Sequence, residues 1–137
     1  MGAVLKPSTE AELAEMISGA GAPLEIISSG SKRQLGHPVQ AAATLDMSAF
    51  AGVIAYEPEE LILDVGTATP LVEIERMLGQ RGQQLAFEPP DWSALLGAHG
   101  SGTVGGLVAC NLSGPRRLKA GAVRDHILGI HGITGAG

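Results

Sequence analysis

The sequence predicts one α+β domain, on the strength of three observations. Two segments have helical periodicity, several short runs have the character of strands, and a glycine-rich segment late in the chain interrupts regular structure. The order is helix, strands, helix, strand, glycine-rich segment and strand, which differs from repeated βαβ units. The 137 residues suffice for one domain, and a hydrophobic content of 45% excludes a disordered chain.

Two helices are expected in the first 80 residues. The first covers 9–20, because Thr9 and Glu12 have the spacing of a capping box. Its apolar face contains Leu13, Met16, Ile17 and Ala20. The second begins at Thr69-Pro70, since proline suits the first helical position, and extends to about Gln80. Its inward face contains Leu71, Ile74, Met77 and Leu78.

Short β-branched and aliphatic runs predict the strands. The expected strands are 24–27, 43–47, 53–57, 60–66, 84–87 and 126–134. Between the last two, residues 97–121 contain seven glycines, and only 103–112 has enough side chains to form a helix.

Composition and charge exclude several classes of protein. The formal net charge is −5, yet residues 106–137 carry four bases against one acid, which favours an anionic ligand or a partner surface there. The four aromatic residues do not alternate with bases, so nucleic-acid binding is not expected. No apolar run reaches the roughly 18 residues of a membrane span. The N-terminus has no apolar stretch typical of a signal sequence.

No residue pattern identifies a catalytic group or a metal site. The four histidines, which are His37, His99, His126 and His131, share no metal-ligand spacing. Cys110 is the single cysteine, which excludes an internal disulfide. Its apolar helical surroundings predict a small core residue. We expect a cytoplasmic protein in a reducing compartment.

The segment Gly100-Ser101-Gly102-Thr103-Val104-Gly105 matches the pattern G-x-G-x-x-G. A nicotinamide-cofactor site would need a strand before it and an acidic residue at the end of a second strand. Asp125 lies 20 residues beyond Gly105, which is the right spacing, but it precedes a predicted strand and does not end one. Two other interpretations stay open: a purely structural glycine turn, and a phosphate cradle in which exposed backbone N–H groups approach an anion.

A second loop, Ser28 to Arg33, has similar chemistry, with hydroxyls, a glycine and two cations. Two such loops, far apart in sequence, would clamp one diphosphate from both sides. This interpretation requires the two loops to share one cleft in the fold.

Five segments follow one another in a diagnostic order: Lys6-Pro7-Ser8-Thr9-Glu10, Ser29-Gly30-Ser31-Lys32, Leu45-Asp46-Met47-Ser48, Asp64-Val65-Gly66-Thr67, and the run from Gly102 to Arg117. Their order resembles the FAD-binding domain of the vanillyl-alcohol oxidase/p-cresol methylhydroxylase family. Within it, Ser113-Gly114-Pro115-Arg116-Arg117 followed by Gly121-Ala122-Val123-Arg124-Asp125 is similar to the FAD-binding subunits of bacterial glycolate oxidases. The resemblance implies an FAD-binding domain of two small α/β subdomains, approximately 1–88 and 89–137, truncated at its C-terminal end.

The resemblance also implies the cofactor-binding residues. The first diphosphate loop would be Ser29, Gly30, Ser31, Lys32 and Arg33. The second would be Gly102, Thr103, Val104, Gly105 and Gly106, with Asn111, Ser113 and Gly114 close to the flavin. Ser28 and Ser29 stand where the family usually has glycines, and Ala120 where relatives often have an aromatic residue. Ser31 stands where covalent members have histidine, which implies non-covalent FAD.

The implied reaction is oxidation of a small 2-hydroxy acid such as glycolate to its 2-oxo acid. The family's substrate-facing groups come largely from a later domain, so this chain alone is not expected to be active. The implied partners are a second flavin subunit and an iron–sulfur subunit, through which the protein would lie peripheral to the inner membrane. The alternative is a non-catalytic assembly module that has lost flavin and docks a partner through Arg116 and Arg117.

Overall fold

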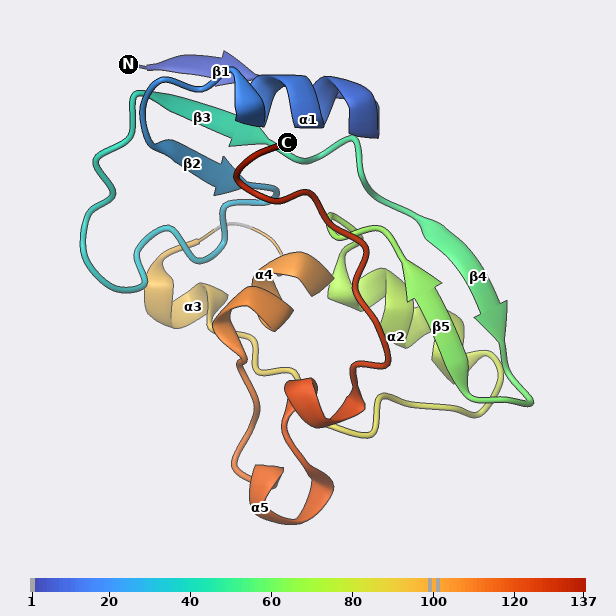
Figure 1. Ribbon diagram of the computed structural model, residues 1–137. Helices are drawn as coiled ribbons and strands as arrows, with labels where there is room; N and C mark the ends of the chain where they lie inside the picture. The colour runs from blue at the N-terminus through green and yellow to red at the C-terminus, as the bar shows by residue number, and fades with distance from the viewer. Residues whose placement is uncertain (1, 99, 101) are drawn as a thin grey trace.

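The computed structural model describes residues 2–98, 100 and 102–137, so His99 and Ser101 of the sequence patterns lie outside the described residues. It contains a three-stranded sheet and a two-stranded sheet, with short helices packed around them (Figure 1). The architecture is α+β, as predicted. No helix in the described part of the chain combines the length and apolar character needed to cross a membrane.

The first sheet is parallel and has the order β1-β3-β2. Its strands are β1 (Ala3–Leu5), β2 (Leu24–Ile27) and β3 (Ala43–Asp46), with Ile26 opposite Leu45 in the centre. Helix α1 (Glu10–Ser18) connects β1 to β2 and lies beside this sheet (Figure 1). Its predicted cap is confirmed, since the Thr9 hydroxyl accepts a hydrogen bond from the Glu12 backbone N–H at 3.2 Å.

The second sheet is an antiparallel hairpin of β4 (Val53–Glu57) and β5 (Ile62–Val65). The chain leaves β5 for α2 (Leu71–Gly79), whose buried face contains Leu71, Ile74 and Leu78 as predicted. Pro70 is the N-cap of this helix and not its first residue. The Gln83 side chain joins the end of α2 to the hairpin, because it bonds the Tyr56 hydroxyl and the Pro58 carbonyl.

The rest of the chain forms short helices around a small core. These are α3 (Ser93–Leu96), α4 (Val104–Cys110), α5 (Arg117–Ala120) and the 3-10 helix η1 (Val123–His126). Leu71, Leu107, Leu112 and Val123 form the buried cluster that joins α2, α4 and η1. The final residues return toward α1, where Gly137 lies against Ser18 (Figure 1).

Four sequence predictions are wrong. Residues 97–121 contain a second helix, α5, beside the helix predicted at 103–112. Residues 84–87 form no strand, because the segment runs irregularly into Pro89-Pro90 and has no pairing partner among the described residues. Residues 126–134 also form no strand. Their first residue ends η1, and Gly129 and Gly132 interrupt an extended segment that pairs with no described strand. Cys110 is exposed at the end of α4 and is not a core residue.

Candidate cofactor-binding site

The first predicted loop begins where β2 ends. Strand β2 pairs in parallel with β3, and the carboxyl ends of parallel strands are common ligand-binding edges. The loop turns at Gly30, whose φ of 68° lies in the left-handed region that glycine adopts readily. Ser31 is buried, whereas the Arg33 guanidinium points outward and forms two hydrogen bonds with the Glu25 carboxylate, at 2.9 and 2.7 Å.

The second predicted loop is fixed to the start of α2 by three backbone hydrogen bonds. Leu71 donates to the Gly102 carbonyl, Val104 to Thr69, and Gly105 to Thr67, at 3.0, 3.1 and 2.7 Å respectively. Thr103 is buried and caps α4 by accepting from the Gly106 N–H. The loop is therefore held by main-chain bonds that do not depend on side-chain identity.

The fold brings the two loops into direct contact. The hydroxyls of Ser28 and Thr103, 75 residues apart, are hydrogen-bonded at 2.9 Å. A Cβ atom on Gly102 would lie 2.7 Å from the Lys32 ammonium and 3.5 Å from the Ser31 hydroxyl. Gly106 faces the same ammonium, with 3.5 Å from its Cβ position to Nζ. The lysine of the first loop thus lies over the glycines of the second.

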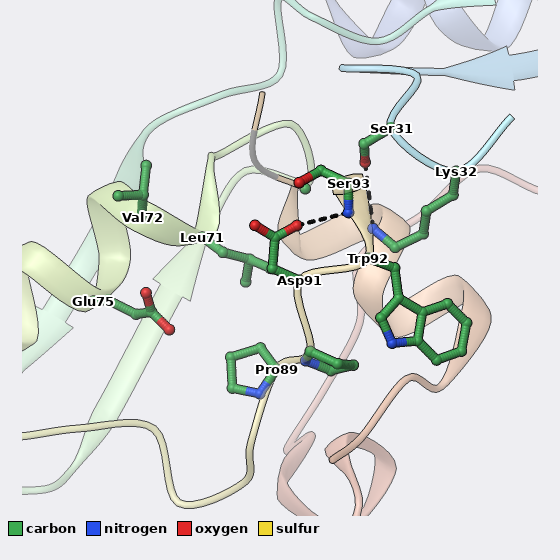
Figure 2. A pocket seen from close by; sticks show the side chains of 11 residues that line it. Ser31, Lys32, Leu71, Val72, Glu75, Pro89, Asp91, Trp92 and Ser93 are labelled. Atoms are coloured by element: carbon green, nitrogen blue, oxygen red, sulfur yellow. Dashed lines mark hydrogen bonds between the residues drawn. The ribbon is translucent and has the colours of Figure 1, made fainter. Parts of the chain in front are cut away.

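A cavity of about 200 Å³ opens beside this contact, with Ser31, Lys32 and Gly102 in its wall. Figure 2 shows the opposite wall, formed by α2 and by the segment from Pro89 to Ser93. Among the described residues, no carboxylate lies within 4.0 Å of the Lys32 ammonium. The nearby Asp91 has a lowered pKa, because its carboxylate accepts hydrogen bonds from the Ser93 backbone and hydroxyl and lies in the field of Lys32.

A second cavity, of about 240 Å³, lies at the C-terminal end of α4. Its polar lining is made of Asn111, Ser113, Arg117 and Arg124. Asn111 has a φ of 47° at the C-cap, a left-handed conformation that asparagine tolerates better than most residues. Its side-chain Oδ1 is buried and has no hydrogen-bond partner among the described residues. Because such an atom costs free energy when unpaired, it marks a place for a donor.

The glycines of the second loop have two different roles. Gly102 and Gly106 face the Lys32 ammonium, and Gly102 also lines the cavity, whereas a Cβ on Gly105 would lie 2.8 Å from the Thr67 carbonyl oxygen. Gly114 is also enclosed by protein, since a Cβ there would lie 2.8 Å from Glu88. The same Glu88 carboxylate pairs with Arg116 at 2.7 Å. Gly105 and Gly114 are thus required for packing, whatever ligand binds nearby.

The other predicted residues lie around these contacts. Ser29 is exposed, and its hydroxyl donates a 3.4 Å hydrogen bond to the Ser31 hydroxyl. Val104 packs against the buried cluster, and the Ser113 hydroxyl accepts from the Val123 N–H at 3.0 Å. Asp91 and Trp92 also line the first cavity, although neither was among the predicted site residues. The Pro89-Pro90-Asp91 run was the available signal, because two prolines hold an extended backbone and aspartate then starts a turn.

This arrangement defines a nucleotide-binding domain of the α+β class, in which a hydroxyl-rich loop after a parallel strand meets a glycine-rich loop before a helix. The whole chain, residues 1–137, matches the family described as FAD binding domain. The chain therefore belongs to that family, as the order of its motifs indicated, and FAD is its cofactor.

Individual relatives agree with this assignment. The chain is 46% identical over 115 residues to the glycolate oxidase subunit GlcE of Escherichia coli (strain K12), a match that covers 84% of this chain and 31% of that protein. The chain thus spans about a third of that relative's length. Two structures of alkyldihydroxyacetonephosphate synthase share the fold, each with a TM-score of 0.63 over 89% of this chain and 23% of theirs, at 16% and 23% identity.

The residues present fit FAD. Among the described residues, the Lys32 ammonium has no paired carboxylate, and its place over Gly102 and Gly106 suits a diphosphate. The unpaired Asn111 Oδ1 needs an N–H donor, and the flavin ring carries one.

Proposed function

We propose that this chain is the FAD-holding part of an oxidoreductase that oxidises a small 2-hydroxy acid, such as glycolate, to its 2-oxo acid. The observation that carries the proposal is the contact between the Ser28 and Thr103 hydroxyls, which unites two phosphate-type loops in one site. The similarity to a glycolate oxidase subunit supports the substrate class.

The two loops make different contributions to FAD binding. Ser29, Gly30, Ser31, Lys32 and Arg33 form the proposed first set, and Gly102, Thr103, Val104, Gly105 and Gly106 form the second. Lys32 supplies the positive charge, and because Gly102 has no side chain, the Lys32 ammonium has room beside it to meet a diphosphate. Ser31 cannot form the histidyl bond of covalent relatives, so the FAD is held non-covalently.

When bound, FAD supplies the two-electron acceptor for the oxidation. The contribution of this chain is to hold and orient the cofactor. Asn111, Ser113 and Gly114 form the proposed flavin-side group, and the buried Oδ1 of Asn111 would fix one edge of the ring. The substrate-binding groups belong to a part of the enzyme beyond these residues.

The assembly follows from the same similarity. We propose that a second flavin subunit and an iron–sulfur subunit complete the enzyme, and that these partners bring it to the cytoplasmic side of the inner membrane. We also propose subdomains of about 1–88 and 89–137, joined by the backbone hydrogen bonds between 67–71 and 102–105 and between Glu88 and Gly114.

A titration of the purified chain with FAD tests the proposal. We expect flavin absorption bands to co-elute with the protein in gel filtration. Acid precipitation should then leave the flavin in the supernatant, because no covalent bond holds it. A colourless protein that does not respond to added FAD would support the assembly module and overturn the proposal. Flavin retained in the precipitate would contradict the non-covalent assignment alone.

A further inference from the structure

One side chain, Trp92, lines both cavities. In the described part of the chain, no other residue borders both the 200 Å³ cavity beside Lys32 and the 240 Å³ cavity beside Asn111. Each cavity is smaller than the roughly 300–1,000 Å³ typical of a complete small-molecule site. Each would therefore take only one part of a larger ligand, and the parts would meet at Trp92.

The chemistry of the two cavities is different. The first offers a lysine ammonium, a serine hydroxyl and a bare glycine backbone, which suit phosphate oxygens. The second is lined by Asn111, whose buried Oδ1 has no partner among the described residues, and by two arginines, a set that suits a flat heterocycle with an N–H donor and carbonyl acceptors. Among the described residues, Arg117 has no ion-pair partner, whereas Arg124 lies 3.6 Å from Asp125.

The indole is held in place by its neighbours. Trp92 is half-buried and packs against the cluster of Leu71, Leu107, Leu112 and Val123. Its backbone is the N-cap of α3, and the Asp91 carboxylate accepts from the Ser93 N–H at 2.9 Å. Figure 2 shows the indole extending from this turn on the side of the view opposite Glu75. A ring fixed in this way loses little side-chain entropy when a ligand contacts it.

We infer that Trp92 is a positioning residue for the flavin ring. The bound cofactor extends from the diphosphate cavity to the Asn111 cavity, and its isoalloxazine lies against the indole between them. This inference rests on the proposed function. It assigns to the first cavity the diphosphate and to the second the polar edge of the ring. Trp92 thus contacts the aromatic part of the cofactor and contributes nothing to diphosphate binding.

The test compares two ligands that share an adenosine diphosphate group, FAD and ADP, by isothermal titration calorimetry on the full chain. Trp92→Leu should weaken FAD binding about tenfold, the usual effect of losing one aromatic stacking partner. ADP affinity should change less than about twofold, because ADP has no flavin ring. Trp92→Phe should stay within about threefold of the original FAD affinity, since it keeps an aromatic face.

Phe87→Leu is the matched control. Phe87 is also aromatic and packs against the same buried cluster, but it lines neither cavity. Phe87→Leu should lower the midpoint of thermal unfolding and leave the ratio of FAD affinity to ADP affinity unchanged. If ADP binding is too weak to measure, the effects of Trp92→Leu and Phe87→Leu on FAD alone make the same comparison.

Three outcomes would overturn the inference, and they can be told apart. Equal losses of FAD and ADP affinity in Trp92→Leu would show that the indole acts only through the fold. Unchanged FAD affinity in that variant would place the ring elsewhere, while the proposed function would stand. If the original chain binds neither ligand, the proposed function itself fails and the inference with it.

Discussion

The two loops of the site perform one task by different physical means. The first, residues 28–33, acts through side chains: a hydroxyl bonded to Thr103, a buried hydroxyl and an ammonium. The second, residues 102–106, acts through bare backbone that three main-chain hydrogen bonds hold in place. We therefore expect binding to be lost in the first loop by removing atoms, and in the second loop by adding them.

The largest effect should come from adding one carbon at Gly105. In Gly105→Ala the new Cβ would lie 2.8 Å from the Thr67 carbonyl oxygen, and backbone cannot move away as a flexible side chain can. Overpacking of this kind costs about 1–3 kcal/mol. We expect a lowered midpoint in thermal unfolding followed by circular dichroism, with FAD binding lost only as a consequence.

Two other alanine substitutions sharpen this prediction. Gly79 has open space around its Cβ position, so Gly79→Ala should not lower the midpoint. In Gly102→Ala the new Cβ would clash only with the flexible end of Lys32. This substitution should therefore weaken FAD binding and leave stability unchanged. If Gly102→Ala and Gly105→Ala behave alike, the division between cavity-facing and packing glycines is wrong.

The next effect concerns the charge of the first loop. Lys32→Met keeps most of the apolar stem but removes the ammonium over Gly102 and Gly106. A hydrogen bond to a charged group contributes about 1.5–3 kcal/mol, so FAD affinity should fall roughly 10- to 100-fold. ADP affinity should fall by the same factor, because the two ligands share the diphosphate.

Salt gives an independent check on Lys32. The affinity of the original chain should decrease as ionic strength rises, and that of Lys32→Met should decrease less, because screening acts on the missing charge. Equal salt dependence in both proteins would show that Lys32 does not contact the diphosphate. Arg81→Gln is the matched control, since Arg81 is an exposed cation that lines neither cavity.

Asn111 tests the comparison differently, because it follows the second loop at the end of α4 and has a side-chain atom without a partner among the described residues, whereas that loop acts through its backbone. Asn111→Gly removes the unpaired Oδ1 and keeps the left-handed backbone, which glycine adopts easily. We expect FAD affinity to fall about tenfold, the effect of losing one hydrogen bond of ordinary strength. ADP affinity and the thermal midpoint should not fall. A lower midpoint with unchanged FAD affinity would instead make Asn111 only a helix cap.

The longer helices and most strands were predictable because their signals are local, whereas β1 and the four-residue helices α3, α5 and η1 were not predicted. The Thr9 cap, the face of Leu71, Ile74 and Leu78, and strands 24–27 and 43–46 need only neighbouring residues to be recognised. The strand predicted at 126–134 failed for the opposite reason. Its isoleucines have strand character, but a strand also needs a partner, and no short-range pattern supplies one.

The contact between the two loops was predictable in kind, and its details only in part. Small and hydroxyl residues identified both loops, and the family resemblance placed them together. The sequence could not separate Gly102, which faces the cavity, from Gly105, which faces Thr67, because both are simply glycines in one motif. Trp92 was missed since its contribution depends on two cavities that form only when distant segments meet.

The smallest effect concerns the negative charge that shares the first cavity with Lys32. The pKa of Asp91 is lowered mainly by hydrogen bonds from Ser93, with a further contribution from Lys32, so its folded value lies below the ordinary 3.8. The Asp91 carboxylate therefore stabilises the fold at pH values above 3.8. This contribution is lost as the pH falls through the lower pKa that the group has in the folded state. Asp91→Asn should reduce the thermal midpoint slightly at pH 7, and the difference should vanish in strong acid.

The same substitution should affect ligand binding in the opposite direction. Removing a carboxylate beside the proposed diphosphate site should raise FAD affinity at pH 7 about two- to threefold at low salt, an effect that salt screens. Between pH 5 and 8 the carboxylate stays charged, so the ratio of the two affinities should be constant. A lower FAD affinity in Asp91→Asn would mean that this carboxylate acts chiefly by orienting Lys32. Binding at the first loop would then depend on two charges, the Lys32 ammonium and the Asp91 carboxylate, and not on the ammonium alone.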